Sequence, residues 1–268
     1  MIQIATQEDV SKFCDYTKDS NKIHNSELMK EQGRKAAVPA MYLMFRDISA
    51  IENPHEAKTI SLEMDNVCSV EDSLTLLYQS RPKLYQILGY ENVKFGSKGI
   101  EGDLVYELDL DSAYQENSSD LNEKEHSMDI KICEKAVNGL ENLFKPKNNL
   151  GRTLSLMTSA SGIMLAAIKD PVNEHEKEIG DLMKKHNLLP VYTGFTYTFP
   201  NGLKPTNSTM ANYSVTFRDN TPKNVKAKQK DIFTKVICET DDIKFNAYFN
   251  FKLVPEKVII RKGLEKLE

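Results

Sequence analysis

A strict alternation of apolar and polar residues constrains the fold more than any other feature of this sequence. Residues 245–253 carry Phe, Ala or Leu at every second position and Asn, Tyr or Lys between them. A period of two predicts a β-strand with one buried and one exposed face. Residues 195–199 alternate in the same way, and residues 232–239 should form the neighbouring strand through a turn at Asp241-Asp242. The second half of the chain therefore contains an expected antiparallel sheet that needs a cover on one face.

An apolar helix precedes the strands in each half. Residues 151–168 are small and apolar and stop before Asp170-Pro171, and residues 40–51 form a similar run after Pro39. A helix that is apolar on most sides is one that a sheet or other helices surround. Strand candidates follow the earlier helix over residues 59–67, 73–80 and 104–110. The repeated order of helix and then antiparallel strands predicts an α+β fold with two similar halves.

A polar segment separates the halves. Residues 112–127 are rich in Asn, Ser and Glu and nearly free of large aliphatic side chains, which is typical of a linker or exposed loop. We therefore expect an N-terminal domain over residues 1–112, a linker over 113–127 and a C-terminal domain over 128–268. His126 lies in this linker and is expected to be solvated.

Composition narrows the class of protein. The chain has 268 residues, with 40% hydrophobic and 28% charged residues, a net charge of -4 and a pI near 5.8. This mildly acidic balance argues against nucleic-acid binding, which usually shows a basic face. The sequence has neither a signal-peptide pattern at its start nor the roughly 18–20 apolar residues of a membrane span. The four cysteines are far apart, so we expect reduced thiols in a cytoplasmic protein, with no metal site.

The segment over residues 19–24 carries the groups best suited to chemistry. Asp19, Asn21 and His24 provide a carboxylate, an amide and an imidazole, on an expected loop that follows a helix over residues 7–18. A carboxylate and an imidazole can together hold one water and move one proton, while an amide holds either in place. The structural alternative is an Asx turn, in which Asp19 and Asn21 cap the next helix.

A second polar element is expected where the helix over residues 40–51 begins. Backbone N–H groups at a helix N-terminus have no acceptor within the helix, and the helix dipole favours negative charge there. The N–H groups of Ala40 and Met41 could therefore bind a developing oxyanion.

The sequence Y-T-K-D-S-N-K-I-H over residues 16–24, followed by V-P-A-M over residues 38–41, resembles the signature of MaoC-like (R)-specific enoyl-CoA hydratases. That family's pattern is approximately S-G-D-x-N-P-[LIV]-H, followed by [IV]-x-G-[ML] at the start of the central helix. The resemblance implies a hot-dog fold. At this chain length it implies a double hot dog, with two antiparallel sheets that each wrap a long central helix.

The resemblance also implies roles for individual residues. Asp19 and His24 match the catalytic pair, Asn21 matches the asparagine that supports the catalytic loop, and Ala40 falls on the glycine whose backbone N–H forms the oxyanion hole. The sequence departs from the pattern at Thr17-Lys18 and Lys22, which replace Ser-Gly and Pro. Ala40 keeps the N–H group but adds a methyl group where the thioester carbonyl should lie.

The implied function is that of a hydro-lyase. It would add water to a trans-2-enoyl thioester, or remove it from an (R)-3-hydroxyacyl thioester, without a cofactor. The partner would be coenzyme A or an acyl carrier protein, whose anionic arm needs a basic residue near the mouth of the site. Candidates by chain proximity are Arg34, Lys35 and Lys98. A homodimer is compatible with this function.

Two other interpretations remain open at this stage. A catalytically weak hot-dog protein could bind acyl thioesters or act as a subunit, which Ala40 and the altered loop favour. A hot-dog thioesterase has no positive signal, and the spacing of Asp19 and His24 speaks against it. The second half has no Asp-x-Asn-x-x-His motif, so it is expected to be structural or acyl-binding and non-catalytic.

Overall fold

The computed structural model describes residues 2–19, 21–31, 33, 35–51, 54–64, 70, 73–75, 79–80, 90–97, 100–107, 126–219 and 230–255. The helices are α1 (Gln7–Thr17), the 3-10 helix η1 (Lys22–His24), α2 (Ser26–Glu31), α3 (Ala40–Ala50), α5 (Glu134–Phe144), α6 (Gly151–Lys169) and α7 (Glu174–His186). The strands are β1 (Ile2–Ile4), β2 (Thr59–Met64), β3 (Ser73–Thr75), β4 (Gln79–Ser80), β5 (Tyr90–Ser97), β6 (Ile100–Glu107), β7 (His126–Lys131), β8 (Leu188–Thr198), β9 (Met210–Asp219), β10 (Lys230–Glu239) and β11 (Lys244–Pro255).

The strands of both halves join in one sheet. Its nine strands follow the order β4-β5-β6-β2-β8-β11-β10-β9-β7, and β1 pairs separately with β3. All described pairs are antiparallel, which confirms the predicted α+β class with antiparallel strands. The expected two separate sheets are not seen among the described strands, because β2 pairs with β8 from Thr59↔Thr198 to Glu63↔Gly194. The edge strands of the two halves thereby satisfy each other's backbone groups.

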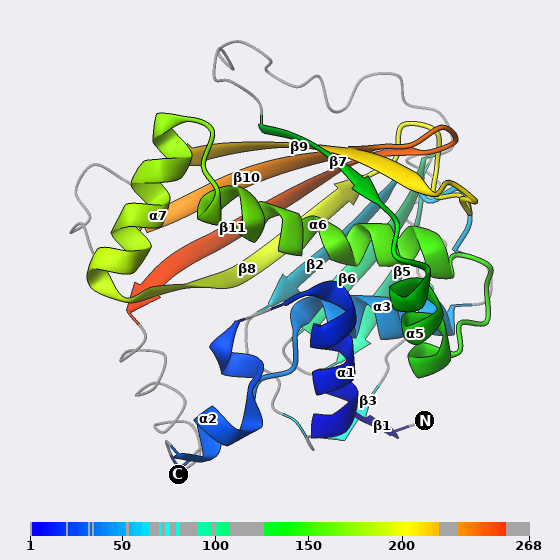
Figure 1. Cartoon of the computed structure of the whole chain (residues 1–268). Helices are drawn as coiled ribbons and strands as arrows, with labels where there is room; N and C mark the ends of the chain where they lie inside the picture. Colours follow the sequence, from blue (N-terminus) through cyan, green and yellow to red (C-terminus); the bar gives the residue numbers. More distant parts are fainter. Residues whose placement is uncertain are drawn as a thin grey trace.

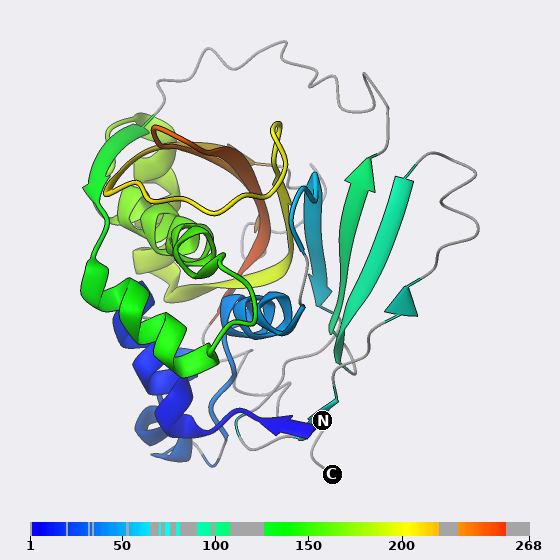
Figure 2. The same cartoon turned by 90° about the vertical axis from the view of Figure 1, so that its right-hand side faces the viewer.

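The strands of the second half curve around α6. Figure 2 shows α6 end-on inside the arc formed by β7, β9, β10, β11 and β8. The inner faces of these strands present large apolar side chains such as Phe245 and Phe249, which are 0% exposed. The hydroxyl groups of Tyr197 and Tyr213 donate to the carbonyl oxygens of Met157 (2.8 Å) and Leu156 (3.1 Å) on α6. The predicted small, apolar helix is therefore a central helix of this half.

Helix α3 is the buried helix of the first half. Residues 41–49 are all buried, and α3 contacts α5, α6 and β5. An aromatic cluster ties it to the outer helices: Phe144 of α5 lies 4.8 Å from Tyr42 and 4.6 Å from Phe45, while Phe13 of α1 lies 5.5 Å from Tyr42, between ring centroids. Figure 1 shows α1 and α5 side by side in front of α3.

The structure also departs from sequence expectation in two places. Helix α5 was not expected, although Val137, Leu140 and Phe144 have helical spacing and the first two are buried. His126 is not solvated. It is 7% exposed in β7, where its Nδ1 lies 3.2 Å from Glu176 Oε2.

Residues 108–125, most of the predicted linker, lie outside the described residues, so the domain boundaries stay a prediction. No helix in the described ranges is long and apolar enough to cross a membrane.

Candidate active site

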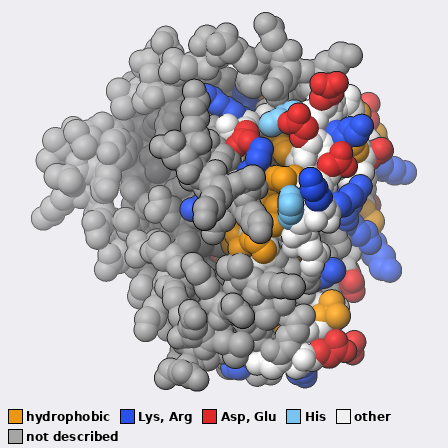
Figure 3. Space-filling view, turned by 90° about the vertical axis from the view of Figure 1, so that its left-hand side faces the viewer, with side chains coloured by type: hydrophobic (Ala, Val, Ile, Leu, Met, Phe, Trp, Pro, Cys, Tyr) orange, Lys and Arg blue, Asp and Glu red, His pale blue; other side chains and the backbone are white. Residues whose placement is uncertain are grey.

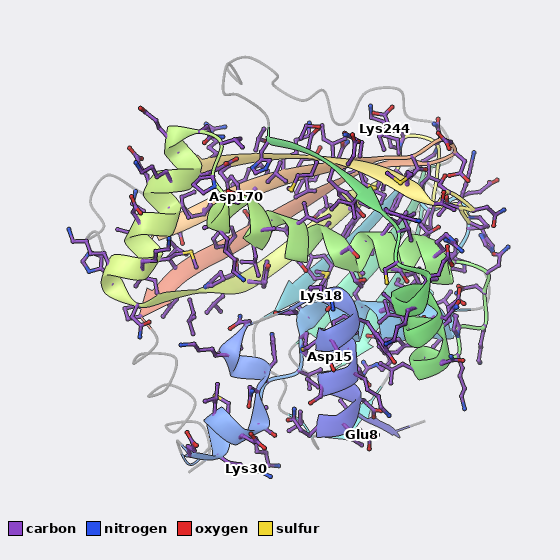
Figure 4. All side chains as sticks on the ribbon, in the orientation of Figure 1. Glu8, Asp15, Lys18, Lys30, Asp170 and Lys244 are labelled. Carbon is purple, nitrogen blue, oxygen red and sulfur yellow. The ribbon has the colours of Figure 1, made fainter. Side chains whose placement is uncertain are left out.

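Helix α1 ends where the candidate site begins. Thr6 caps its N-terminus through a capping box with Asp9, and Lys18 ends it in a left-handed conformation with φ 59°. Figure 4 labels Asp15 and Lys18 along α1, with Lys18 at the end nearer α6. A Cβ atom on Gly162 of α6 would lie 2.9 Å from the Thr17 carbonyl oxygen. Glycine at this position therefore lets the end of α1 approach α6 closely.

The loop after α1 is ordered by its own polar side chains. Asp19 Oδ1 accepts a hydrogen bond from the Asn21 N–H (3.0 Å), which forms the Asx turn of the structural alternative. Asn21 Oδ1 accepts from the Ile23 N–H (3.4 Å) and caps η1. The amide of Asn21 also donates to the Pro190 carbonyl of β8 at 3.4 Å. Asn21 therefore connects the loop of the first half to a strand of the second.

His24, the last residue of η1, is hydrogen-bonded to the segment that leads into α3. Its Nδ1 lies 2.7 Å from the Ala37 carbonyl oxygen, and the Ala37 N–H donates to the Ile23 carbonyl at 2.9 Å. Gln7 of α1 donates to the His24 carbonyl at 3.2 Å. A carbonyl oxygen only accepts, so Nδ1 carries the proton and Nε2 of the neutral ring is an acceptor.

Asp19 and His24 face each other. Asp19 Oδ2 lies 3.6 Å from His24 Nε2, and their side chains are 16% and 10% exposed. Because Asp19 Oδ1 is occupied by the turn, the carboxylate serves the loop with one oxygen and faces the imidazole with the other. A water oxygen about 2.8 Å from both atoms would hydrogen-bond to each. The structure thus brings together the two predicted residues, whose catalytic roles stay a prediction.

The N-terminus of α3 begins three residues after the acceptor of His24. Pro39 is the N-cap and its side chain makes no capping hydrogen bond, while the Leu43 N–H already donates to the Pro39 carbonyl at 3.3 Å. The N–H groups of Ala40, Met41 and Tyr42 have no acceptor within the helix. Ala40 is helical and half-buried, so the position does not require the positive φ that would favour glycine.

Of the three basic residues predicted near the mouth of the site, the structure describes one. Arg34 and Lys98 lie outside the described residues, and Lys35 is exposed on the segment before α3.

Figure 3 shows the face at the α7 end of the sheet, where a hydrophobic patch is bordered by histidine and by side chains of both charges. Over the described residues, no three His, Cys, Asp or Glu side chains gather to hold a metal ion.

The nearby thiol of Cys14 on α1 is not activated. Burial, and to a smaller extent the carboxylates of Asp19 and Asp15, raise the pKa of Cys14 to about 12. A thiolate is the nucleophilic form of cysteine. Cys14 is therefore a neutral packing residue beside the loop.

Comparison with known proteins bears on the fold. No protein-family model matches the chain, and no curated protein matches its sequence. Among solved structures, a MaoC-like dehydratase covers 94% of this chain and 95% of its own, with 7% identity and a TM-score of 0.53. A MaoC domain protein dehydratase from Chloroflexus aurantiacus covers 94% of this chain and 93% of its own, with 8% identity and a TM-score of 0.59.

The chain has the fold of these MaoC-like dehydratases. Coverage of nearly the whole of both chains means that the likeness extends over both halves. The resemblance drawn from residues 16–24 and 38–41 therefore pointed to the correct fold. At identities of 7% and 8%, these structures do not assign a reaction to the chain.

Several residues of the site carry no signal in the motif. Gln7 holds the loop through its side-chain amide, whereas Ala37 and Pro190 hold it through backbone carbonyl oxygens that any residue would supply. The Asp19 carboxylate also acts electrostatically on Tyr192 of β8, because it adds to the larger effect of burial in raising the pKa of that hydroxyl. The sequence gives one signal near Tyr192: Gly194 is a glycine within a strand, and such glycines often mark a β-bulge.

Proposed function

We propose that this chain is a hydro-lyase that adds water to a trans-2-enoyl thioester or removes it from an (R)-3-hydroxyacyl thioester. The acyl group would be carried by coenzyme A or an acyl carrier protein. One observation carries the proposal: the Asp19–His24 pair, separated by 3.6 Å, is anchored through Ala37 to the segment that begins α3. The water-handling groups and the unpaired N–H groups of the helix are thereby part of one unit.

The chemistry follows from the protonation of these groups. Asp19 Oδ2 and His24 Nε2 hold the water, and Nε2 removes one of its protons as the water oxygen forms a bond to C3 of the enoyl group. The π electrons of the C2=C3 bond move toward the thioester oxygen, where the α3 N–H groups stabilise the negative charge. The imidazolium then returns a proton to C2. Hydrogen and hydroxyl have then added across the double bond, and the reverse sequence releases water.

The two halves have different roles in this proposal. We propose that they are the two hot dogs of a double hot dog, joined edge to edge through β2 and β8. The first half supplies Asp19, His24 and the Ala40 N–H, and the second half supports the acyl chain. The hydrogen bond from Asn21 to the Pro190 carbonyl supports a site that depends on both halves.

A direct assay tests this function. Purified protein is mixed with crotonyl-CoA and with longer trans-2-enoyl-CoAs, and the loss of enoyl absorbance is followed. Chiral analysis of the product should give the (R)-3-hydroxyacyl thioester. Absence of hydration with every chain length, on both coenzyme A and carrier-protein thioesters, would contradict the proposal.

A second candidate is a protein that binds acyl thioesters without turning them over. The half-buried methyl group of Ala40 at the start of α3 favours it, because that methyl group stands beside the N–H groups that the thioester oxygen would approach. Calorimetry with a 3-hydroxyacyl-CoA separates the candidates. Binding with no hydration supports this second function.

A further inference from the structure

The strand that meets the loop carries a tyrosine whose environment is unusual. Asn21 donates to the Pro190 carbonyl of β8, and Tyr192 follows two residues later on the same strand. Burial, and to a smaller extent the Asp19 carboxylate, hold the pKa of Tyr192 well above its ordinary value. Its hydroxyl therefore stays protonated and can donate a hydrogen bond.

A β-bulge turns Tyr192 toward the interior. In the pairing of β8 with β11, Phe195 lies opposite Phe249 and Gly194 opposite Asn250, but Phe251 then meets Tyr192 because the register skips Thr193. Without the extra residue, the alternation would place Thr193 on the inner face. Bulges often re-aim a side chain next to a functional site. Here the bulge leaves Thr193 exposed and packs the Tyr192 ring edge-on against Phe249 (5.9 Å) and Phe251 (6.2 Å).

The hydroxyl group of Tyr192 lacks a protein partner. Its oxygen is buried and makes no hydrogen bond to any described residue. The inward hydroxyl groups of Tyr197 and Tyr213 on the same sheet instead donate to carbonyl oxygens of α6. Leaving a buried hydroxyl unpaired destabilises the fold, and unpaired groups of this kind call for an explanation such as a bound ligand or a catalytic role.

We propose that Tyr192 is a third catalytic residue, contributed by the second half of the chain. Its hydroxyl donates a hydrogen bond to the oxygen that Asp19 holds, which is the attacking water in hydration and the leaving 3-hydroxyl in dehydration. This inference rests on the proposed hydro-lyase function. It also replaces the expectation that the second half is non-catalytic. With Asp19 as acceptor and Tyr192 as donor, the oxygen is fixed from both halves at once.

The test removes the hydroxyl and keeps the ring. Tyr192→Phe preserves the contacts with Phe249 and Phe251, so kcat for enoyl-CoA hydration should fall about 100-fold, the scale for losing one positioned donor, with little change in KM. The melting temperature should stay equal or rise, because an unpaired polar group is removed. Tyr213→Phe is the matched control, since it removes a satisfied hydroxyl on β9, which two strands separate from β8 in the sheet. It should lower the melting temperature and leave kcat unchanged.

The outcomes separate this inference from the function itself. If Asp19→Asn abolishes hydration but Tyr192→Phe keeps wild-type kcat, the hydro-lyase function stands and the role of Tyr192 is wrong. If the wild-type protein hydrates nothing, calorimetry with (R)-3-hydroxybutyryl-CoA decides. An affinity at least about fivefold weaker in Tyr192→Phe than in wild type and Tyr213→Phe supports a hydrogen bond to the 3-hydroxyl, whereas equal affinities or no binding overturn it.

Discussion

His24 Nε2 lies 3.6 Å from Asp19 Oδ2, while the other ring nitrogen of His24 lies 2.7 Å from the Ala37 carbonyl oxygen. The contact with the Ala37 carbonyl fixes the proton on Nδ1. It therefore leaves Nε2, which faces Asp19, as the basic atom of the ring. A carboxylate oxygen and an unprotonated nitrogen at this separation can share one water. The imidazole is thus oriented from behind by a backbone carbonyl, as second-layer partners orient ligating and catalytic histidines elsewhere.

The first prediction concerns this pair. Asp19→Asn and His24→Ala should each reduce the rate of enoyl-CoA hydration by about 10²–10⁴-fold, the usual scale for positioned acid–base groups. The double variant should be little slower than the slower single variant, because residues that act as a unit are not additive. Steady-state kinetics on the three variants measures both effects. Multiplicative losses, or full activity in both single variants, would show that the pair does not act on one water.

A second prediction tests the support given by Asn21. Asn21→Ala removes the cap of η1 and the hydrogen bond to Pro190, so turnover should fall about tenfold, and unfolding free energy by about 1 kcal/mol. Asn25→Ala is the control in the same segment: Asn25 Oδ1 accepts from the N–H groups of Glu27 (3.0 Å) and Leu28 (3.2 Å) without joining β8. It should cost similar stability and spare kcat. Equal loss of kcat in both variants would mean that Asn21 acts only through loop stability.

The third prediction concerns Ala40. Since Ala40 is helical and half-buried, Ala40→Gly removes a methyl group without relieving backbone strain. If that methyl group hinders the thioester oxygen, kcat/KM for hydration or the affinity for acyl-CoA should rise severalfold, while stability falls by up to about 1 kcal/mol from the helix propensity of glycine. Unchanged kinetics and affinity, with the expected loss of stability, would remove the argument for hindered catalysis.

Local pattern predicted the elements whose period is unambiguous. The alternation over residues 245–253 matches β11, and the apolar runs after Pro39 and from residue 151 match α3 and α6. These patterns are reliable because a residue on the buried face recurs at every second position of a strand and at every third or fourth position of a helix. The loop residues Asp19, Asn21 and His24 were singled out from the sequence because their residue types and spacing resemble a known motif, and the turn and cap that order the loop are local.

Features that depend on distant pairing could not be predicted in this way. The joining of the halves rests on the pairing of β2 with β8, strands that lie far apart in the chain, and no local periodicity encodes it. The bulge at Thr193 reverses the face of Tyr192, so simple alternation from Phe195 places Tyr192 on the wrong side. The prediction that His126 is solvated was wrong because it rested on the polar residues next to it in the sequence. Its partner Glu176 comes from α7, 50 residues away.

The last prediction concerns a buried ion pair that hydrophobic patterning did not anticipate. Arg46 and Asp47 of α3 are 2% and 0% exposed, and Arg46 Nε donates to Asp47 Oδ1 at 2.6 Å. Removing one partner leaves a buried charge, so Arg46→Met or Asp47→Leu alone should each lower the unfolding free energy by about 3–5 kcal/mol. The double variant should be more stable than either single variant. Urea denaturation of the four proteins at pH 7 measures the coupling.

The same pair should make stability depend on pH. Burial raises the pKa of Asp47 and Arg46 only partly offsets this effect, so the pKa in the folded protein is about 6. Since the folded pKa lies above the unfolded value of about 4, the folded state binds the proton more tightly. The stability that Asp47 contributes is complete below pH 4 and is lost as the pH rises through about 6. The double variant lacks this group, so wild type should lose stability relative to it between about pH 4 and about pH 6, and the difference should level off above that range. A wild-type advantage that instead grows over this range would mean that Arg46 outweighs burial and that Asp47 ionises below its ordinary pKa.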